Sequence, residues 1–297
     1  MRQISEADIT NEVLKRHDGT PDPRLKQLMQ GLVKHLHAFI REVEPTEAEW
    51  LKAIEFLTAT GQICTDKRQE FILLSDTLGV SMLVDLINHR KPAGATESTV
   101  LGPFYAHGAP ELPPGGNIAP GDPGIPCVVS GRVLDLEGKP IAGALLDVWQ
   151  TGSDALYDVQ KPESEAAPVR GRFRTDAEGR YSFRTVRPVT YSIPQDGPVG
   201  TMLRATDRPF YRPAHIHFLV AAPQFETVTT HIFDAADPQL DADPVFAVKD
   251  SLVSEFRRHD VADRDVGVAP PFYSLDQDFV LKPSDGGATG PAWGAQR

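Results

Sequence analysis

Apolar residues recur along this chain with two different periods, and the change between them comes near residue 90. From Pro23 to Val43 apolar side chains return every three or four positions, which is the period of an amphipathic helix. Residues 46–49 (TEAE) have the pattern of a capping box ahead of a second such stretch, which starts at Trp50. A further helix is expected to start near Asp66 and to carry the apolar residues Phe71, Leu74, Leu78, Met82 and Leu86. The first part of the chain is therefore predicted to be helical.

After Arg90 the pattern changes to short strands separated by turns. Residues 108–126 are rich in glycine and proline and are expected to form a loop. Strand-like segments follow at residues 127–136, 142–150, 171–186 (read as a hairpin that turns at 176–179), 215–221 and 227–233. The prediction is an α+β fold, with a helical N-terminal domain over residues 1–95 and a mainly antiparallel β-sandwich or barrel over residues 96–297. The end of the chain, residues 282–297, is expected to be loose.

Composition and charge narrow the class of protein. The 297 residues are 40% hydrophobic and 24% charged, as in ordinary globular proteins, and the net charge of −11 disfavours binding to nucleic acid or to an anionic membrane. The two cysteines, Cys64 and Cys127, lie in segments of different character, which disfavours a disulfide framework or a zinc–thiolate site. No signal peptide or membrane-spanning run is visible. We predict a cytoplasmic protein without nucleic-acid partners or membrane insertion.

The pair His215 and His217 is the strongest local sign of chemistry. On a strand, residues i and i+2 face the same side with their Cα atoms roughly 6.5 Å apart, so two imidazoles can bind one ion. The pattern is short and also describes two ordinary strand histidines. A carboxylate as third ligand would indicate a ferrous triad. Tyrosine would need a strongly Lewis-acidic ion such as ferric iron, because the phenol pKa is about 10. Spacing does not choose among the six tyrosines.

Five ordered motifs carry a resemblance to a known family. They are residues 97–105 (ESTVLGPFY), 147–150 (DVWQ) with 157–158 (YD), 170–176 (RGRFRTD), 191–194 (YSIP) with 196–200 (DGPVG), and 212–217 (RPAHIH). With these motifs the chain resembles the intradiol ring-cleavage dioxygenases, which include catechol, chlorocatechol and hydroxyquinol 1,2-dioxygenases. The resemblance implies a catalytic β-sandwich that holds Fe(III) through two tyrosines and two histidines. By motif these ligands are Tyr157, Tyr191, His215 and His217.

The same resemblance implies roles for residues in and near the metal site. In the family the diol binds the ferric ion and displaces one tyrosinate, which by motif is Tyr191, while Tyr157 stays bound. Arg212 matches an arginine beside the substrate ring, where a cation stabilises developing negative charge; a surface or sheet-edge salt bridge is the alternative. His231 stands where many catechol enzymes have glutamine, and either a polar contact or simple packing would explain it.

Several segments, among them residues 73–79 (LLSDTLG) and 193–194, resemble the hydroxyquinol 1,2-dioxygenases. The positions that line the pocket in that subgroup match Leu73, Asp76, Val100, Leu101, Gly102, Pro103, Phe104, Ile193, Pro194, Arg212 and Val245. Asp76 would accept a hydrogen bond from a third ring hydroxyl; a helix-capping or solvent-facing Asp76 is the alternative. Leu101 replaces the phenylalanine common in the subgroup and changes the shape of the pocket. A substrate whose ring carries a chlorine or an alkyl group is therefore also compatible with the sequence.

The functional prediction is cleavage of hydroxyquinol (1,2,4-trihydroxybenzene) by dioxygen to 3-hydroxy-cis,cis-muconate, which tautomerises to maleylacetate. Catechol and chlorocatechol are the alternative substrates. A metal-free, transthyretin-like β-sandwich that only binds a partner is the alternative of another class. The resemblance also implies a homodimer formed through the N-terminal helices, in some members with a bound lipid. The apolar stripe from Leu25 to Val43 fits that dimer, and it fits packing on the chain's own sheet equally well.

Overall fold

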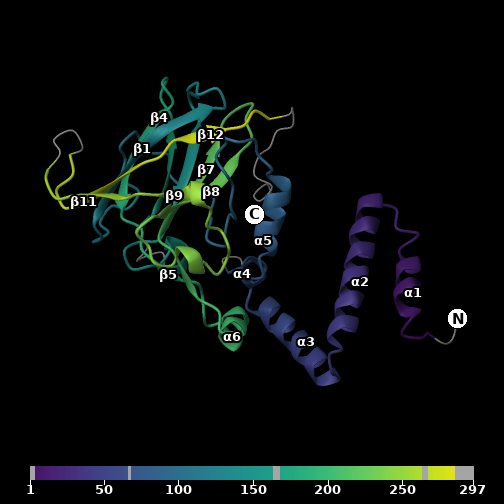
Figure 1. Ribbon diagram of the computed structural model, residues 1–297. Helices are drawn as coiled ribbons and strands as arrows, with labels where there is room; N and C mark the ends of the chain where they lie inside the picture. Colours follow the sequence, from purple (N-terminus) through teal and green to yellow (C-terminus); the bar gives the residue numbers. More distant parts are fainter. Residues whose placement is uncertain (1–3, 66–67, 163–167, 263–266, 285–297) are drawn as a thin grey trace. The chain divides into compact units, whose positions relative to one another are not determined.

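The computed structural model describes residues 4–65, 68–162, 168–262 and 267–284 (Figure 1). The backbone divides into two compact units, residues 1–59 and residues 60–297. The helices are α1 (Ile9–Arg16), α2 (Pro23–Val43), α3 (Glu47–Gln62), α4 (Glu70–Thr77), α5 (Val80–Asn88) and α6 (Pro198–Ala205). Short 3-10 turns are η1 (Asp158–Gln160), η2 (Leu240–Ala242) and η3 (Asp250–Leu252). The strands are β1 (Pro126–Asp135), β2 (Leu145–Trp149), β3 (Arg170–Arg174), β4 (Arg180–Val186), β5 (Tyr191–Ser192), β6 (Tyr211–Arg212), β7 (His215–Ala221), β8 (Val228–Asp234), β9 (Val253–Ser254), β10 (Arg257–His259), β11 (Phe272–Asp276) and β12 (Phe279–Leu281).

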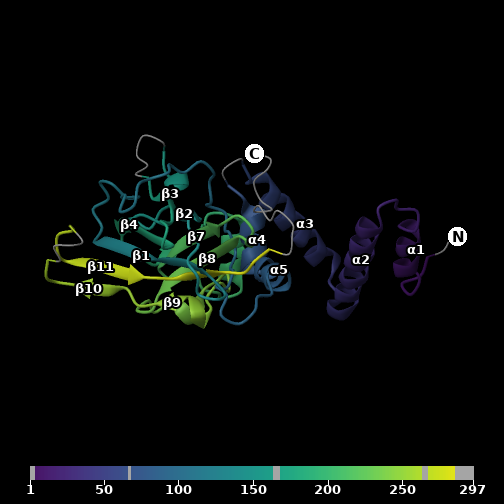
Figure 2. The ribbon, with the colours of Figure 1, turned by 90° about the horizontal axis from the view of Figure 1, so that it is seen from above.

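The first unit contains the helix that the apolar period predicts. Helix α2 begins at Pro23 behind Asp22, whose side chain accepts hydrogen bonds from the backbone N–H groups of residues 24 and 25. The capping box before α3 is also confirmed. The backbone N–H of Thr46 donates to Glu49 Oε2 at 2.8 Å, and that of Glu49 donates to Thr46 Oγ1 at 3.3 Å. Helix α1 lies beside α2 (Figures 1 and 2).

The helix expected from Asp66 onwards is two helices, so this prediction is wrong in its extent. Asp66 itself lies outside the described residues, and α4 begins at Glu70. The break falls at Gly79, which has a φ of +71° and separates α4 from α5. Glycine enters the left-handed region at little steric cost, so the chain can change direction there.

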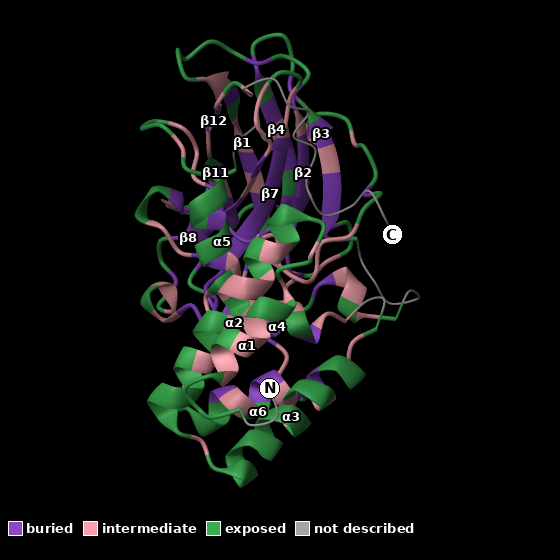
Figure 3. Ribbon diagram, turned by 90° about the vertical axis from the view of Figure 1, so that its right-hand side faces the viewer, coloured by how far each residue is buried: buried purple, intermediate pink, exposed green. Residues whose placement is uncertain are grey.

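The predicted mainly antiparallel sandwich is confirmed. One sheet has the order β10-β11-β1-β12, with β4 also paired to β1, and the other has the order β3-β2-β7-β8-β9. Within the described sheets, only the pairs β1–β11, β1–β12 and β8–β9 are parallel. The inner strands β2 and β7 are largely buried, whereas the helices show exposed faces (Figure 3). Val129, Leu146 and Phe218 belong to the apolar core of this unit.

The predicted hairpin over residues 171–186 is wrong. The turn itself forms, because the backbone N–H of Gly179 donates to the carbonyl of Asp176 at 3.1 Å. The two strands that it joins enter different sheets: β3 pairs with β2, and β4 pairs with β1. Local turn chemistry predicts that the chain reverses, but each strand pairs with a strand elsewhere in the chain, and this long-range pairing decides the sheet.

Among the described residues, no helix combines the length and the apolar character that a membrane crossing requires.

Candidate metal centre and active site

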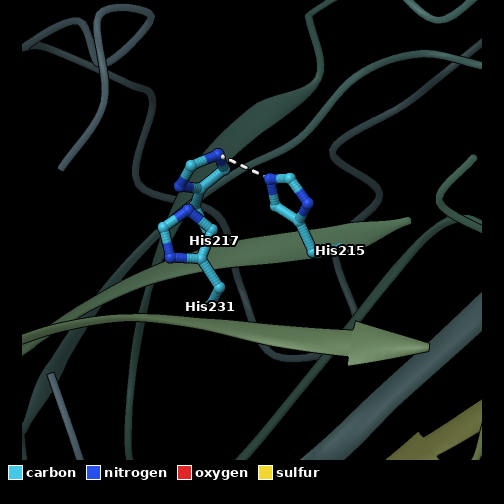
Figure 4. A group of neighbouring side chains, drawn as sticks. All are labelled: His215, His217 and His231. Atoms are coloured by element: carbon cyan, nitrogen blue, oxygen red, sulfur yellow. Dashed lines mark hydrogen bonds between the residues drawn. The ribbon is translucent and has the colours of Figure 1, made fainter. Parts of the chain in front are cut away.

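Two neighbouring strands bring three histidines together. His215 and His217 lie two residues apart on β7, so they share one face, and antiparallel pairing places His231 of β8 opposite His217. Figure 4 shows the three rings converging above the strands. Their potential ligand nitrogens all lie within 4.8 Å of one another, and all three residues are buried.

Two tyrosines complete a compact group of donor atoms around this pair. Tyr157 directly precedes η1, and its Oη lies 2.8 Å from His217 Nε2, 3.5 Å from His215 Nε2 and 3.2 Å from Tyr191 Oη. Tyr191 begins β5. The structure therefore brings together all four residues that the family motifs indicate, although they lie up to 60 residues apart in the chain.

The spacing of these donor atoms fits a shared cation. The two Nε2 atoms are 3.1 Å apart, so the four separations run from 2.8 to 3.5 Å. Metal–nitrogen and metal–oxygen bonds of about 2.0–2.1 Å, as for zinc or magnesium, put two ligands about 2.9 Å apart at a right angle and about 3.4 Å apart at a tetrahedral angle. Each of these four separations is therefore one that two ligands of a single ion of ordinary size can have.

The ring nitrogen of His215 that carries the proton is also the one expected for a metal ligand. Its Nδ1 lies 2.6 Å from the carbonyl oxygen of Pro213, so this nitrogen carries the proton and donates it. The lone pair is then on Nε2, which faces the other three donor atoms. A backbone carbonyl behind a histidine orients metal-binding imidazoles in this way.

Burial disfavours charge on these groups when no cation is present. Desolvation, followed by the influence of Tyr191, holds the pKa of the Tyr157 phenol well above its ordinary value. Desolvation likewise lowers the pKa values of His215 and His217, with the positive charge of Arg212 acting in the same direction. A phenolate at this position therefore requires a strong Lewis acid beside it.

Arg212 supplies a buried positive charge at the edge of the group. Pairing of β5 with β6 places Arg212 opposite Tyr191, and its Nη1 lies 3.2 Å from Tyr191 Oη. Its Nε donates to Asp243 Oδ1 at 3.0 Å. Burial lowers the pKa of the guanidinium, but the charges of Asp243 and the tyrosines outweigh this and raise it, so Arg212 stays charged. Both partners of this salt bridge are buried, so it is not a surface one, but it lies at a sheet edge, because β6 belongs to a two-stranded sheet.

Comparison with known proteins identifies the family. Residues 100–283 match the family described as "Dioxygenase", and residues 22–96 match "Catechol dioxygenase N terminus". Hydroxyquinol 1,2-dioxygenase of Rhizobium sp. (strain MTP-10005) is 52% identical over 91% of this chain and 92% of its own length. The 6-chlorohydroxyquinol 1,2-dioxygenase of Cupriavidus pinatubonensis is 48% identical over 96% of this chain and 100% of its own length.

A solved structure, that of hydroxyquinol 1,2-dioxygenase from Pseudomonas putida DLL-E4, superposes with a TM-score of 0.87 at 49% identity, over 94% of this chain and 99% of that one. The chain belongs to the intradiol dioxygenase family. This dioxygenase is therefore an enzyme and not a metal-free binding module, and it belongs to a family whose members depend on iron and act on aromatic diols with dioxygen.

Outside the metal group, aromatic and ionic contacts hold the tyrosine and histidine rings of the dioxygenase. Trp149 stacks on His217 with ring centroids 4.6 Å apart, and Phe104 stacks on Tyr157, also at 4.6 Å. Arg170 forms a short ion pair with Asp158, the residue after Tyr157, and also donates to the carbonyls of residues 104 and 106. The motifs at 147–150 and 170–176 marked these segments, but their sequence alone assigned no role to Trp149 or Arg170.

The predicted pocket residues lie in two environments. Leu101 and Phe104 pack against the buried cluster of Trp149, Tyr157 and Tyr191. The backbone of Gly102 passes the ring of His217, since a Cβ placed on it would lie 3.8 Å from Cε1. Val100 and Val245 are buried in the main apolar core. The others named from the motif are Leu73 and Ile193, which are buried, and Pro103 and Pro194, which are half-buried.

Asp76 is buried, with only 2% of its surface exposed, so it does not face solvent. Desolvation raises the pKa of its carboxyl to about 6, and Asp243 acts in the same direction, while a hydrogen bond from Ser81 and the charge of Arg212 oppose the shift. The carboxyl thus lies within electrostatic reach of the Arg212–Asp243 ion pair. Asp243 itself had no signal in the sequence, because it follows Arg212 by 31 residues and belongs to no motif.

Proposed function

We propose that this enzyme uses ferric iron to cleave hydroxyquinol with dioxygen, between its two adjacent hydroxyl-bearing carbons, to 3-hydroxy-cis,cis-muconate and hence maleylacetate. The observation that carries the reaction type is the convergence of four donor atoms from Tyr157, Tyr191, His215 and His217. The choice of hydroxyquinol over catechol or chlorocatechol rests on relatives named for hydroxyquinol at about half identity and on the buried Asp76.

The donor set supports ferric rather than ferrous iron. Two phenolates bring two negative charges into a buried site where desolvation alone would keep at least Tyr157 protonated. A trivalent ion compensates that charge better than a divalent one. Bound ferric iron would hold the two adjacent oxygens of the diol and make its ring reactive towards dioxygen.

The surroundings of the two tyrosines support different roles for them. Tyr157 is fully buried and stacks on Phe104. Among the described residues, Arg212 donates a hydrogen bond to Tyr191 Oη and none to Tyr157. A tyrosine that leaves the metal when substrate binds needs a partner for its oxygen, and Arg212 provides one. We therefore assign Tyr191 as the ligand that leaves and takes a substrate proton on Oη, and Tyr157 as the permanent ligand.

Arg212 is also placed to act on the substrate. Its guanidinium lies beside the oxygen that Tyr191 would vacate, so a diol bound there would meet a buried positive charge. Such a charge favours negative charge that develops on the ring during cleavage. The remaining predicted pocket residues, among them Leu101 and Ile193, would then surround the ring, with Asp76 next to a third hydroxyl.

Turnover of hydroxyquinol, catechol and 4-chlorocatechol by the iron-loaded protein tests this proposal. We expect the purified protein to be red to burgundy, because tyrosinate-to-iron charge transfer absorbs visible light, and we expect the highest kcat/KM with hydroxyquinol. A preference for catechol would reject the substrate and leave the reaction type standing. Protein that stays colourless after iron loading would reject the ferric tyrosinate site.

We also propose that the enzyme is a homodimer joined through its N-terminal helices, with the helical domain ending near residue 95. The family matches support this boundary, since one ends at residue 96 and the other begins at residue 100. One side of α2 carries exposed apolar residues: Leu25, Leu28, Leu32, Leu36, Phe39 and Val43. A groove of about 580 Å³, lined by apolar residues such as Met82 and Leu86 of α5, is the candidate site for a lipid chain. We further propose the cytoplasm as the location, which fits two cysteines that no disulfide joins.

The oligomeric state tests the dimer. Leu32→Glu introduces a charge into the apolar side of α2, and we expect it to convert a dimer into a monomer at micromolar concentration. Gln27→Glu adds the same charge on the opposite side of this helix and should leave the dimer intact. Light scattering coupled to size-exclusion chromatography measures both. A monomeric wild-type protein, or dimers for both variants, would reject the interface.

A further inference from the structure

His231 lies behind the metal group and contacts both of its histidines. Its ring centroid is 4.7 Å from that of His215 and 4.0 Å from that of His217, and its ring stacks on Phe233. The residue is fully buried. Its two nitrogens face different partners, because Nδ1 forms a short hydrogen bond with Thr99 Oγ1 and Nε2 lies 3.5 Å from Arg212 Nη1.

The hydrogens of Arg212 determine what His231 does. Nη1 carries two hydrogens and lies near three acceptors: Tyr191 Oη at 3.2 Å, His215 Nε2 at 3.4 Å and His231 Nε2 at 3.5 Å. A metal bound to His215 uses the Nε2 lone pair of that residue. The two hydrogens are then matched by the two remaining acceptors, Tyr191 and His231. Because a guanidinium can only donate, His231 can accept from it only through an unprotonated Nε2.

The tautomer of His231 follows from this. A neutral imidazole with a bare Nε2 carries its proton on Nδ1, which here faces Thr99 Oγ1, an atom able to accept it. Arg212 therefore donates a hydrogen bond to His231, and His231 in turn donates one to Thr99. Thr99 immediately precedes the predicted pocket segment at 100–104, so this chain of contacts joins the arginine to the wall of the pocket.

We propose that His231 is a positioning residue that keeps the Arg212 guanidinium in place when Tyr191 moves away from the metal. Asp243 holds Nε and Nη2, but among the described residues Nη1 has only Tyr191 and His231 as available acceptors once the metal is bound. If Tyr191 leaves to admit substrate, His231 is the acceptor that stays. This inference rests on the proposed function, since it assumes both the metal and the departure of Tyr191.

Two substitutions separate this role from packing. His231→Gln can present its amide oxygen to Arg212 and its amide N–H to Thr99, so it reproduces both contacts. His231→Leu fills the site but removes the acceptor. For the iron-loaded proteins we expect unchanged iron content and resting colour in both variants. We expect kcat for hydroxyquinol about tenfold lower in His231→Leu, with KM within about threefold of wild type, and near-wild-type kcat in His231→Gln.

Thr99 provides a second test that does not alter the ring. Thr99→Val removes the acceptor of Nδ1–H without changing the size of the side chain, whereas Thr99→Ser keeps it. We expect Thr99→Val to lower kcat in the same direction as His231→Leu, and Thr99→Ser to spare it. This pair decides the question if His231→Leu fails to fold.

The outcomes separate the two proposals. A colourless or inactive wild-type protein would reject the proposed function itself. With an active wild type, loss of iron in His231→Leu would make His231 a ligand or a support of the metal. Unchanged kcat in His231→Leu, or an equal loss in His231→Gln, would reject positioning through the hydrogen bond.

Discussion

Replacement of His217 by alanine is expected to leave the protein folded but to remove its iron, and to lower kcat for hydroxyquinol by more than about 100-fold. Changing only an outer-shell partner of a metal ligand already costs roughly 10- to 100-fold in affinity or activity, and loss of a ligand should exceed this. His217 Nε2 lies 2.8 Å from Tyr157 Oη and 3.1 Å from His215 Nε2, so it is in direct contact with two of the other three donor atoms. Iron content per chain, visible absorbance and kcat measure the effect.

The matched control is His259→Ala. His259 lies on β10 in the other sheet, where its Nε2 contacts Ser274 Oγ at 2.8 Å. This variant should keep iron, colour and turnover. Because His217 also stacks on Trp149, its loss removes packing as well, and a thermal melting curve separates unfolding from loss of metal. A folded His217→Ala protein with full iron content and full colour would show that His217 is not a ligand.

Substitution of Asp76 by asparagine should lower kcat/KM for hydroxyquinol by about 10- to 100-fold and change that for catechol by less than about threefold. A buried carboxylate that accepts a hydrogen bond from a third hydroxyl forms a charge-assisted contact, and the neutral amide forms a weaker one. Catechol has no hydroxyl at that position, so the substitution should leave its kcat/KM nearly unchanged. The control is Asp207→Asn, an exposed aspartate whose left-handed φ of +52° asparagine also tolerates.

The pH dependence of the wild-type preference for hydroxyquinol over catechol independently tests whether the Asp76 carboxylate contacts the third hydroxyl. Desolvation raises the pKa of this carboxyl to about 6, so it is protonated below that pH and is an anionic acceptor above it. The ratio of kcat/KM for hydroxyquinol to that for catechol should therefore fall as the pH is lowered through about 6. The Asp76→Asn protein should show a flat ratio over the same range. Equal losses for both substrates in that variant would assign Asp76 to the placement of Arg212 and not to the third hydroxyl.

Local patterns predicted those parts of the fold that depend on near neighbours in the chain. The bounds of α2, the capping box at Thr46 and the strands β7 and β8 all follow from hydrophobic period and capping chemistry. The errors occurred where a distant partner competes with a local preference. The turn at Asp176 reverses the chain as expected, yet β3 and β4 separate because β2 and β1 pair with them.

By itself, the sequence determined that His215 and His217 share one face, because the strand period requires it. It did not determine which tyrosines join them. Motif resemblance selected Tyr157 and Tyr191, and only tertiary structure brings their oxygens within 3.2 Å of each other. Asp243 beside Arg212, and His231 opposite His217, were likewise decided by folding. The physical reason is that strand periodicity acts between adjacent residues, whereas register between strands and the closure of long loops depend on the packing of the whole sandwich.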